Sequence, residues 1–307
     1  MRLDIALTSQ TGIKSRAFSQ RLIDDGRVRV NGKKARKASM EVSTSDVIEW
    51  DAPPTITPSA QQVSNVNLDI LFEDDHCMVI HKPAGLTVHP GHGSKHDEET
   101  VLSALKPMFA KRKIAFSEGE VLVHRLDKET TGCLLIAKTP AAHLMLQNQF
   151  ANRTVDKRYL AVVDGIPEPP AAIIDAPIGR HASQRTRMSV HQATGSRPAR
   201  TTYRLLSSSK EASLLECELH TGRTHQIRVH LRSIEHPILG DGTYATNSSR
   251  QRSEKFSLAH LCLHAWKLRF RSPSKKEINV TCPPPDTFFE TMKTLDIDCL
   301  KVLTADR

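Results

Sequence analysis

Polar side chains gathered between two apolar stretches are the part of this sequence best suited to chemistry. Apolar residues at 121–123 and 133–137 predict two strands, and a polar loop held by a rigid sheet is a common place for an active site. Asp127 is the leading candidate, because positive neighbours would keep its carboxylate ionised and able to act as a nucleophile even in a desolvated cleft. The loop contains His124, Arg125, Asp127, Lys128, Glu129, Thr130 and Thr131, of which Lys128 and Glu129 suit an ordinary solvated loop.

A second polar cluster occupies residues 220–231 and combines histidines with arginines. Gly222 is placed to end a strand, and a helix is predicted over residues 224–233. Helical spacing would put His225, Arg228 and Arg232 on one face, and Ile227, Leu231 and Ile234 on the other. We expect the apolar face to pack inward. The basic face is suited equally to solvent, to a bound phosphate and to pairing with an acid.

The elements that position these clusters predict an α+β fold. Strands and helices alternate irregularly after residue 68, which favours α+β over a doubly wound parallel sheet. The predicted strands are 77–81, 121–123, 133–137, 159–163 and 214–219, and the predicted helices are 141–152 and 224–233.

The first fifty residues predict a separate small domain that binds RNA. Residues 15–25 predict a helix that ends at Gly26, followed by a strand at 28–30 and by Asn31-Gly32, a strong hairpin signal. Residues 27–37 contain no acid. A solvated charged hairpin is the alternative, but the density of cations beside a basic helix favours RNA contact. The candidate RNA-binding residues are Arg16, Arg27, Arg29, Lys33, Lys34, Arg36 and Lys37.

A change in composition separates this domain from the rest of the chain. Residues 51–67 are rich in Pro, Ser, Thr and Gln and nearly lack large apolar residues, which is typical of a linker. The predicted organisation is therefore a domain at 1–50, a linker at 51–67 and a catalytic domain at 68–307.

Composition and charge narrow the class of protein. The net charge of +9 points to a polyanionic partner, because clustered Lys and Arg release the counterions of phosphates. No apolar run is long enough for a membrane span or a signal peptide. The six cysteines are scattered without a Cys-x-x-Cys, which predicts neither a zinc site nor a disulfide framework. We expect a cytoplasmic monomer without a metal or cofactor.

Six short motifs in order, over about residues 70–285, resemble the RluA-type pseudouridine synthases. Departures are mild: Thr131 stands where the family usually has Ser, and residues 197–201 match loosely. The N-terminal helix and hairpin resemble the alpha-L RNA-binding fold over residues 15–33. The six motifs are His-Lys-Pro-Ala-Gly-Leu-Thr-Val-His-Pro-Gly (81–91), His-Arg-Leu-Asp-Lys-Glu-Thr-Thr-Gly (124–132), Lys-Arg-Tyr-Leu-Ala (157–161), Arg-Thr-His-Gln-Ile-Arg-Val-His (223–230), His-Pro-Ile-Leu-Gly-Asp (236–241) and Leu-His-Ala (263–265).

The resemblance implies a fold and an activity. The fold would be a mixed, largely antiparallel central sheet flanked by helices, with the small alpha-L domain in front. The activity would be isomerisation of specific uridines to pseudouridine in structured RNA, either large-subunit ribosomal RNA or, as the lesser alternative, transfer RNA. The uracil would leave its stack, break its bond to the ribose and rejoin through carbon 5. This reaction needs no redox cofactor or group donor.

The resemblance also implies roles for particular side chains. Asp127 would be the catalytic carboxylate, acting on either the base or the sugar, and Arg228 would form an ion pair with it. Tyr159 would stack on the target base and help to remove the proton from carbon 5, although a plain strand tyrosine fits the sequence as well. Ile227 would be an apolar wall under the base. Arg125 would fill the gap left by the flipped base or contact a phosphate, and His124 would contact the substrate. Lys82 and Pro83 have a structural character.

Two other functions fit parts of the sequence. A glycosidase needs two carboxylates, and Asp127 with Glu129 would supply them; an RNA N-glycosidase would release free uracil instead of returning it to the sugar. A ribosome-assembly factor would bind RNA through the N-terminal domain without catalysis, but the set of Asp127, Tyr159 and Arg228 speaks against it.

Overall fold

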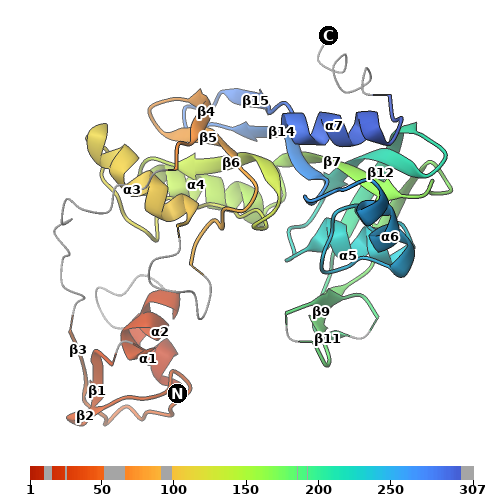
Figure 1. Ribbon diagram of the computed structural model, residues 1–307. Helices are drawn as coiled ribbons and strands as arrows, with labels where there is room; N and C mark the ends of the chain where they lie inside the picture. Colours follow the sequence, from red (N-terminus) through yellow and green to blue (C-terminus); the bar gives the residue numbers. More distant parts are fainter. Residues whose placement is uncertain are drawn as a thin grey trace. The chain divides into compact units, whose positions relative to one another are not determined.

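The computed structural model describes residues 1–9, 16–24, 26–51, 66–90, 99–184, 186–191 and 193–298. The chain forms two compact units, residues 1–62 and residues 63–307. Figure 1 shows both units, with most of their helices and strands labelled. Within the described ranges, no helix has the length and apolar character needed to cross a membrane.

The N-terminal unit packs two helices against a three-stranded antiparallel sheet with the order β2-β1-β3. The predicted helix and hairpin are present, and Asn31 and Gly32 both have the positive φ that a tight hairpin turn requires. The first helix and the third strand were not predicted; Leu3 and Leu7, four residues apart, bury one face of that helix. Most of the predicted linker, residues 52–65, lies outside the described residues. The elements are α1 (Leu3–Ser9), α2 (Arg16–Asp24), β1 (Val28–Val30), β2 (Lys33–Lys34) and β3 (Ile48–Trp50).

The second unit is built on a nine-stranded sheet with the order β4-β5-β6-β14-β7-β13-β12-β8, and β15 pairs with β14. Among the strand pairs of this sheet in the described ranges, only β6–β14 is parallel, so the expected mixed, largely antiparallel sheet is confirmed. The strands are β4 (Asp69–Glu73), β5 (Cys77–Lys82), β6 (Thr131–Ala137), β7 (Asp156–Asp164), β8 (Ala171–Asp175), β12 (Arg200–Ser208), β13 (Ala212–Leu219), β14 (Leu263–Arg271) and β15 (Glu277–Thr281).

The parallel β6–β14 pair lies at the centre of the sheet and requires a glycine. Gly132 pairs with Ala265 and has a φ of 113°. A Cβ at Gly132 would stand 2.2 Å from the carbonyl oxygen of Ala265, so a larger residue would push the strands apart. The close pairing of Gly132 with Ala265 fixes the point at which the polar loop enters β6.

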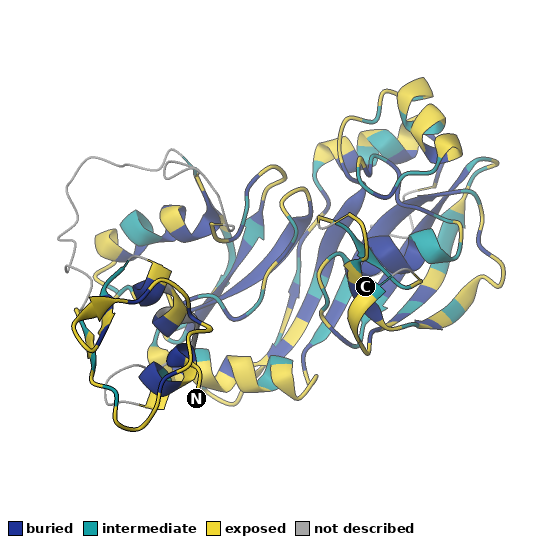
Figure 2. Cartoon of the chain, turned by 90° about the horizontal axis from the view of Figure 1, so that it is seen from below, coloured by how far each residue is buried: buried dark blue, intermediate teal, exposed yellow. Residues whose placement is uncertain are grey.

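Helices cover both faces of the sheet and bury its central strands. All seven residues of β6 are buried, with Leu134 in one core cluster and Leu135 in another, against Leu146 of α4. Each such leucine contributes about 1.5–3 kcal/mol when fully buried. Figure 2 shows these strands as buried, and exposed residues on the outer surfaces of the helices. The helices are α3 (Val101–Lys111), α4 (Pro140–Ala151), α5 (Gln226–Ser233), α6 (Asn247–Lys255) and α7 (Asp286–Thr294).

A separate small sheet lies beyond α5, as Figure 1 shows. Its strands have the order β10-β9-β11 and are antiparallel. Gly179 lets the strands approach closely, since a Cβ there would stand 2.6 Å from the carbonyl oxygen of Thr194. The strands are β9 (Ile178–His181), β10 (Met188–Ser189) and β11 (Ala193–Arg197).

Two predicted elements differ from the structure. Residues 121–123 form no strand; Leu122 makes only a single bridge to Ile136, so the polar loop begins earlier than expected. The predicted helix at 224–233 begins at Gln226, because His225 has a φ of 56° in the left-handed region. The predicted inward packing of the apolar face of α5 is confirmed at Ile227 and Leu231, which are both buried. Every residue from 226 to 231 is buried, because the helix is packed on several sides.

Candidate active site

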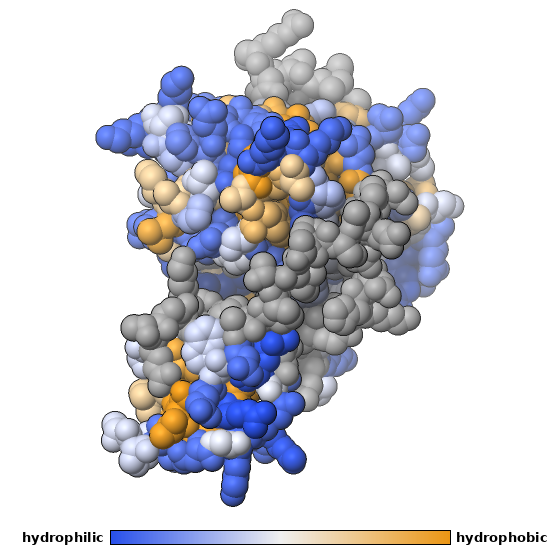
Figure 3. Space-filling model, turned by 90° about the vertical axis from the view of Figure 1, so that its left-hand side faces the viewer, coloured by the Kyte–Doolittle hydropathy of each residue, from blue (hydrophilic) through white to orange (hydrophobic). Residues whose placement is uncertain are grey.

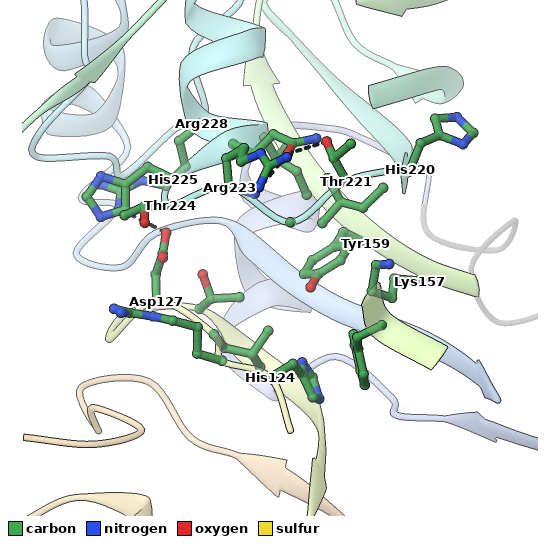
Figure 4. A pocket seen from close by; sticks show the side chains of 18 of the residues that line it. His124, Asp127, Lys157, Tyr159, His220, Thr221, Arg223, Thr224, His225 and Arg228 are labelled. Carbon is green, nitrogen blue, oxygen red and sulfur yellow. Dashed lines mark hydrogen bonds and ion pairs between the residues drawn. The ribbon is translucent and has the colours of Figure 1, made fainter. Parts of the chain in front are cut away.

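A cleft of about 500 Å³ opens between the polar loop, β7 and the N-terminal end of α5. The polar loop contributes the candidate carboxylate, β7 contributes the tyrosine and α5 contributes the arginine. Figure 4 shows Asp127, Tyr159 and Arg228 in this pocket. The structure thus brings together all six residues predicted for catalysis and substrate contact, although they come from distant parts of the chain: His124, Arg125, Asp127, Tyr159, Ile227 and Arg228.

Arg228 connects two carboxylates. Its Nη1 donates to Oδ2 of Asp127 at 3.2 Å. Its Nε and Nη2 donate to the two oxygens of Asp241 at 2.7 and 2.9 Å. The two parallel bonds to Asp241 fix the plane of the guanidinium, and the remaining nitrogen points at Asp127. The sequence left solvent, a bound phosphate and an acid open as partners for the basic residues of this helix. Arg228 pairs with acids in the cleft, and Arg232 makes an ion pair with Glu235 at the surface.

The ionisation of this group of side chains follows from its neighbours. Burial alone would lower the pKa of Arg228, but the hydrogen bonds and negative charges of Asp241 and Asp127 raise it above its ordinary value. Burial would raise the pKa of Asp241, yet its bonds to Arg228 and to backbone N–H groups lower it. A fixed positive charge therefore faces the Asp127 carboxylate.

Asp241 is a site residue that the sequence analysis did not assign. Its side chain is fully buried, and its Oδ1 also accepts hydrogen bonds from the N–H groups of Thr243 and Tyr244 at 2.8 and 3.0 Å. Gly240 makes the turn possible, because a Cβ there would stand 1.8 Å from the carbonyl oxygen of His260. The only signal for Asp241 in the sequence was the motif at 236–241, and this motif does not indicate that Asp241 pairs with Arg228.

Tyr159 places a phenol in the cleft from β7. Its side chain is 7% exposed, and its hydroxyl forms no hydrogen bond within the described ranges of the chain. Burial, and then the charge of Asp127, raise the pKa of the phenol, so it is protonated at neutral pH. Ile227 is 3% exposed and adds an apolar surface to the same cleft.

Comparisons with known proteins identify the family of this chain. The family model for RNA pseudouridylate synthase matches residues 76–233, and that for the S4 domain matches residues 1–48. Ribosomal large subunit pseudouridine synthase D of Nitrosomonas europaea is 42% identical over 93% of this chain and 82% of the relative. The enzyme of the same name from Zymomonas mobilis is 37% identical over 96% of this chain and 94% of the relative.

The chain belongs to the RNA pseudouridylate synthase family.

Solved structures of the family share its fold. Human RNA pseudouridylate synthase domain containing 4 is 30% identical, with a TM-score of 0.61 over 75% of this chain and 94% of that one. Human RNA pseudouridylate synthase domain containing 1 is 26% identical, with a TM-score of 0.59 over 71% of this chain and 84% of that one. The chain is an isomerase with an RNA-binding S4 domain at its N-terminus.

Tyr244 joins the small sheet of the synthase to the charged group. Its hydroxyl accepts a hydrogen bond from the backbone N–H of Met188 at 2.9 Å and lies 2.8 Å from Nδ1 of His225. Its ring contacts two guanidinium groups, those of Arg187 and Arg228, at 5.3 and 5.0 Å from the ring centre. Burial lowers the pKa of His225. The predicted position of His225 on the helix is wrong, and its place before the helix directs it to Tyr244.

His124 interacts mainly with other residues of the protein. Its Nε2 accepts a hydrogen bond from the backbone N–H of Leu135 at 2.8 Å. Its ring stacks on Phe150 with the centroids 4.6 Å apart. Burial and the charge of Lys157 lower the pKa of His124 to about 3, so the ring is neutral. Any contact of His124 with the substrate therefore involves its other nitrogen or its ring edge.

The half-buried, neutral His124 predicts a pH-dependent stability. Unfolding returns its pKa from about 3 to the ordinary 6.5, so the unfolded chain takes up a proton between these values. The stabilisation is complete above pH 6.5 and is lost as the pH falls toward 3. His124→Asn keeps an acceptor for the N–H group of Leu135 but has no imidazole to protonate. When the pH is lowered from 7 to 5, we expect the free energy of unfolding of the wild type to fall by about 1–2 kcal/mol more than that of His124→Asn. Urea unfolding at both pH values measures this difference. Parallel losses in the two proteins would contradict the assignment.

Lys82 ties the polar loop to the end of β5. Its side chain is fully buried, and its Nζ donates to the carbonyl oxygens of Pro83, Leu86 and Lys128 at 2.6, 2.9 and 2.9 Å. Burial lowers the pKa of Lys82 to about 8, although Glu129 and Asp127 act in the opposite direction. These contacts agree with the structural character expected for Lys82.

The candidate RNA-binding residues of the N-terminal unit are mostly exposed. Arg29 is exposed between the buried Val28 and Val30, as strand alternation requires. Arg27 is half-buried, and the side chain of Arg16 lies outside the described part of the chain. Figure 3 shows a largely hydrophilic surface over much of this unit, at the bottom of the view. The exposed cations are Arg29, Lys33, Lys34, Arg36 and Lys37.

Carboxylates other than Asp127 are missing from the described lining of the cleft. Glu129 is exposed and does not line it, so the pair that a glycosidase needs is not assembled there. Among the described residues, His, Cys, Asp and Glu form no group of three or more that could hold a metal ion.

Proposed function

We propose that this synthase isomerises uridines in large-subunit ribosomal RNA and that Asp127 is its catalytic carboxylate. The observation that carries the proposal is the pair of Asp127 and Arg228 in a cleft that also holds Tyr159. Asp241 holds Arg228 from behind, so the carboxylate meets a guanidinium whose orientation is already set before substrate arrives.

The geometry suits a reaction on one flipped nucleotide. The uracil would lie between the phenol of Tyr159 and the apolar side chain of Ile227, with the glycosidic bond near the Asp127 carboxylate. Asp127 would support cleavage of the bond from the ribose to nitrogen 1, and the base would turn and rejoin through carbon 5. The proton on carbon 5 must then leave. The Tyr159 phenol is protonated before substrate binds. It can therefore accept the proton from carbon 5 only after it has given up its own hydroxyl proton. Arg125, exposed at the cleft, would fill the space that the base left.

The proposed identity of the RNA substrate depends on the names of the relatives and on the net charge of the protein. Several relatives bear the name ribosomal large subunit pseudouridine synthase D, and the net charge of +9 suits a large folded polyanion. A protein that modifies ribosomal RNA in a bacterial cell works in the cytoplasm. Transfer RNA is the alternative substrate.

Mapping of pseudouridines in cells with and without the gene tests the proposal. We expect one or a few positions of large-subunit ribosomal RNA to lose pseudouridine, and the wild-type gene to restore them. Loss only in transfer RNA would overturn the ribosomal assignment. Release of free uracil by the purified protein would instead indicate an N-glycosidase.

The hairpin of the N-terminal unit should contribute affinity for RNA without affecting chemistry. We expect the full-length variant Lys33→Gln, Lys34→Gln, Arg36→Gln and Lys37→Gln to bind RNA more weakly and to show a smaller salt dependence. Each phosphate contact that is lost lowers the slope of log K against log salt by roughly 0.7–0.9. Filter binding of RNA at several salt concentrations measures the slope. An unchanged slope would mean that this hairpin contacts something other than RNA.

A further inference from the structure

Three arginines meet at the edge of the catalytic cleft from three separate elements. Arg153 follows α4, Arg197 ends β11, and Arg223 lies between β13 and α5; all three line the cleft. Burial lowers the pKa of Arg223, and the positive charges of Arg197 and Arg153 lower it further. Arg223 is therefore close enough to Arg197 and to Arg153 to be repelled by their charges.

These arginines have no acidic partner within the described ranges. Arg223 donates its Nε to the carbonyl oxygen of Pro198 at 3.0 Å, and Arg153 and Arg197 form no ion pair there. Asp127, the carboxylate of the described cleft lining, is already paired with Arg228. Like charges held together without a counter-charge are unfavourable, and an anion placed between them would remove that cost.

A second groove continues from this point over the small sheet. It has a volume of about 390 Å³ and shares Arg197, Gly222, Arg223 and Thr224 with the catalytic cleft. Arg180 of β9 lies further along it and is exposed. Gly179 and Gly195 also line it and add no side chains. The groove is thus a basic path that joins the catalytic cleft at Arg197 and Arg223.

We propose that Arg153, Arg197 and Arg223 bind the backbone phosphates on one side of the flipped uridine, and that the RNA strand continues along the second groove past Arg180. This rests on the proposed function, because it requires a nucleotide of a longer RNA in the cleft. Guanidinium groups bind phosphate oxygens through two parallel hydrogen bonds. Phosphates next to the reacting nucleotide would thus hold the strand while the base is out of its stack.

Substitution of each arginine by Gln in the full-length synthase tests the site. We expect KM for an RNA fragment with the mapped uridine to rise about tenfold for each variant, as for loss of one charge-assisted contact, with kcat within about twofold, the pattern of lost uniform binding. The salt slope of binding should fall by roughly 0.7 for each variant. Arg271→Gln is the matched control, because Arg271 is exposed at the end of β14 and lines neither groove.

Neutral linkages in the RNA locate the contact. Fragments carrying a single methylphosphonate at each position around the uridine should lose affinity for the wild type at one or two linkages on one side. A methylphosphonate at one of those linkages should cause little further loss of affinity in the arginine variants, because these variants already lack the contact. Full additivity at every linkage, or unchanged KM and salt slope in all three variants while the wild type forms pseudouridine, would overturn the site. If the wild type forms no pseudouridine in any RNA, the proposed function itself fails.

Discussion

Replacement of Asp127 by Asn should abolish turnover while RNA binding remains. The amide has the shape of the carboxylate but lacks its charge, and the proposed chemistry requires that charge where the glycosidic bond breaks. We expect kcat to fall by at least about 10³-fold, which corresponds to roughly 4 kcal/mol of lost transition-state stabilisation. Single-turnover formation of pseudouridine, together with RNA binding by the same protein sample, measures both quantities.

Glu129→Gln is the matched control for this experiment. Glu129 lies two residues further along the same loop, is exposed and does not line the cleft. It should keep its activity, whereas a glycosidase that used Asp127 and Glu129 as a pair would lose activity in both variants. The Asn variant should still fold, because Arg228 keeps both hydrogen bonds to Asp241. Appreciable turnover in Asp127→Asn would remove the catalytic assignment.

Replacement of Asp241 by Asn should impair both stability and catalysis. Asp241 is fully buried and neutralises a guanidinium that is only 10% exposed. Loss of one partner from a buried ion pair costs about 3–5 kcal/mol when the other charge stays buried without compensation. Asp127 still compensates part of the Arg228 charge, so the lower end of this range applies. An amide also turns an N–H group toward the donors of Arg228. We expect urea unfolding to show a loss of this size.

The effect of Asp241 on catalysis would pass through the position of Arg228. Without two parallel hydrogen bonds, the guanidinium would no longer hold its plane toward Asp127, and misplacement of a catalytic group by about 1 Å can cost 10²-fold in rate. We therefore expect kcat to fall by about 10²-fold in Asp241→Asn, with KM nearly unchanged. Arg228→Lys should lower kcat in the same way, since an ammonium cannot make the paired bonds.

Asp164→Asn separates a positioning role for Asp241 from a purely structural one. Asp164 forms an ion pair with Arg252 at 2.6 Å, and its side chain is only 9% exposed. Neither residue lines the cleft. This variant should lose stability but keep its kcat at temperatures where it is folded. Equal kcat in Asp241→Asn, Asp164→Asn and the wild type would show that Asp241 supports the fold alone.

Local patterns in the sequence were sufficient where the information lies within one element or one turn. Asn31-Gly32 predicted a tight hairpin, because few residues tolerate positive φ at both positions of the turn. The apolar run at 133–137 predicted a buried strand. The motif around Asp127 predicted the polar loop and, by resemblance, the family. In each case neighbouring residues carry the signal.

Contacts between distant segments were decided only by the tertiary structure. Asp127 and Arg228 are 101 positions apart, and the register of β6 on β14 and the packing of α5 determine that they meet. The partner of Arg228 could not be read from residue types, because any of the acids could have filled that position; the turn at Gly240 selects Asp241. The helical spacing of α5 predicted the burial of Ile227 and Leu231, but for the same reason it left the partner of Arg228 open. Periodicity reports the faces of an isolated helix, but how many neighbours cover it depends on the assembled fold.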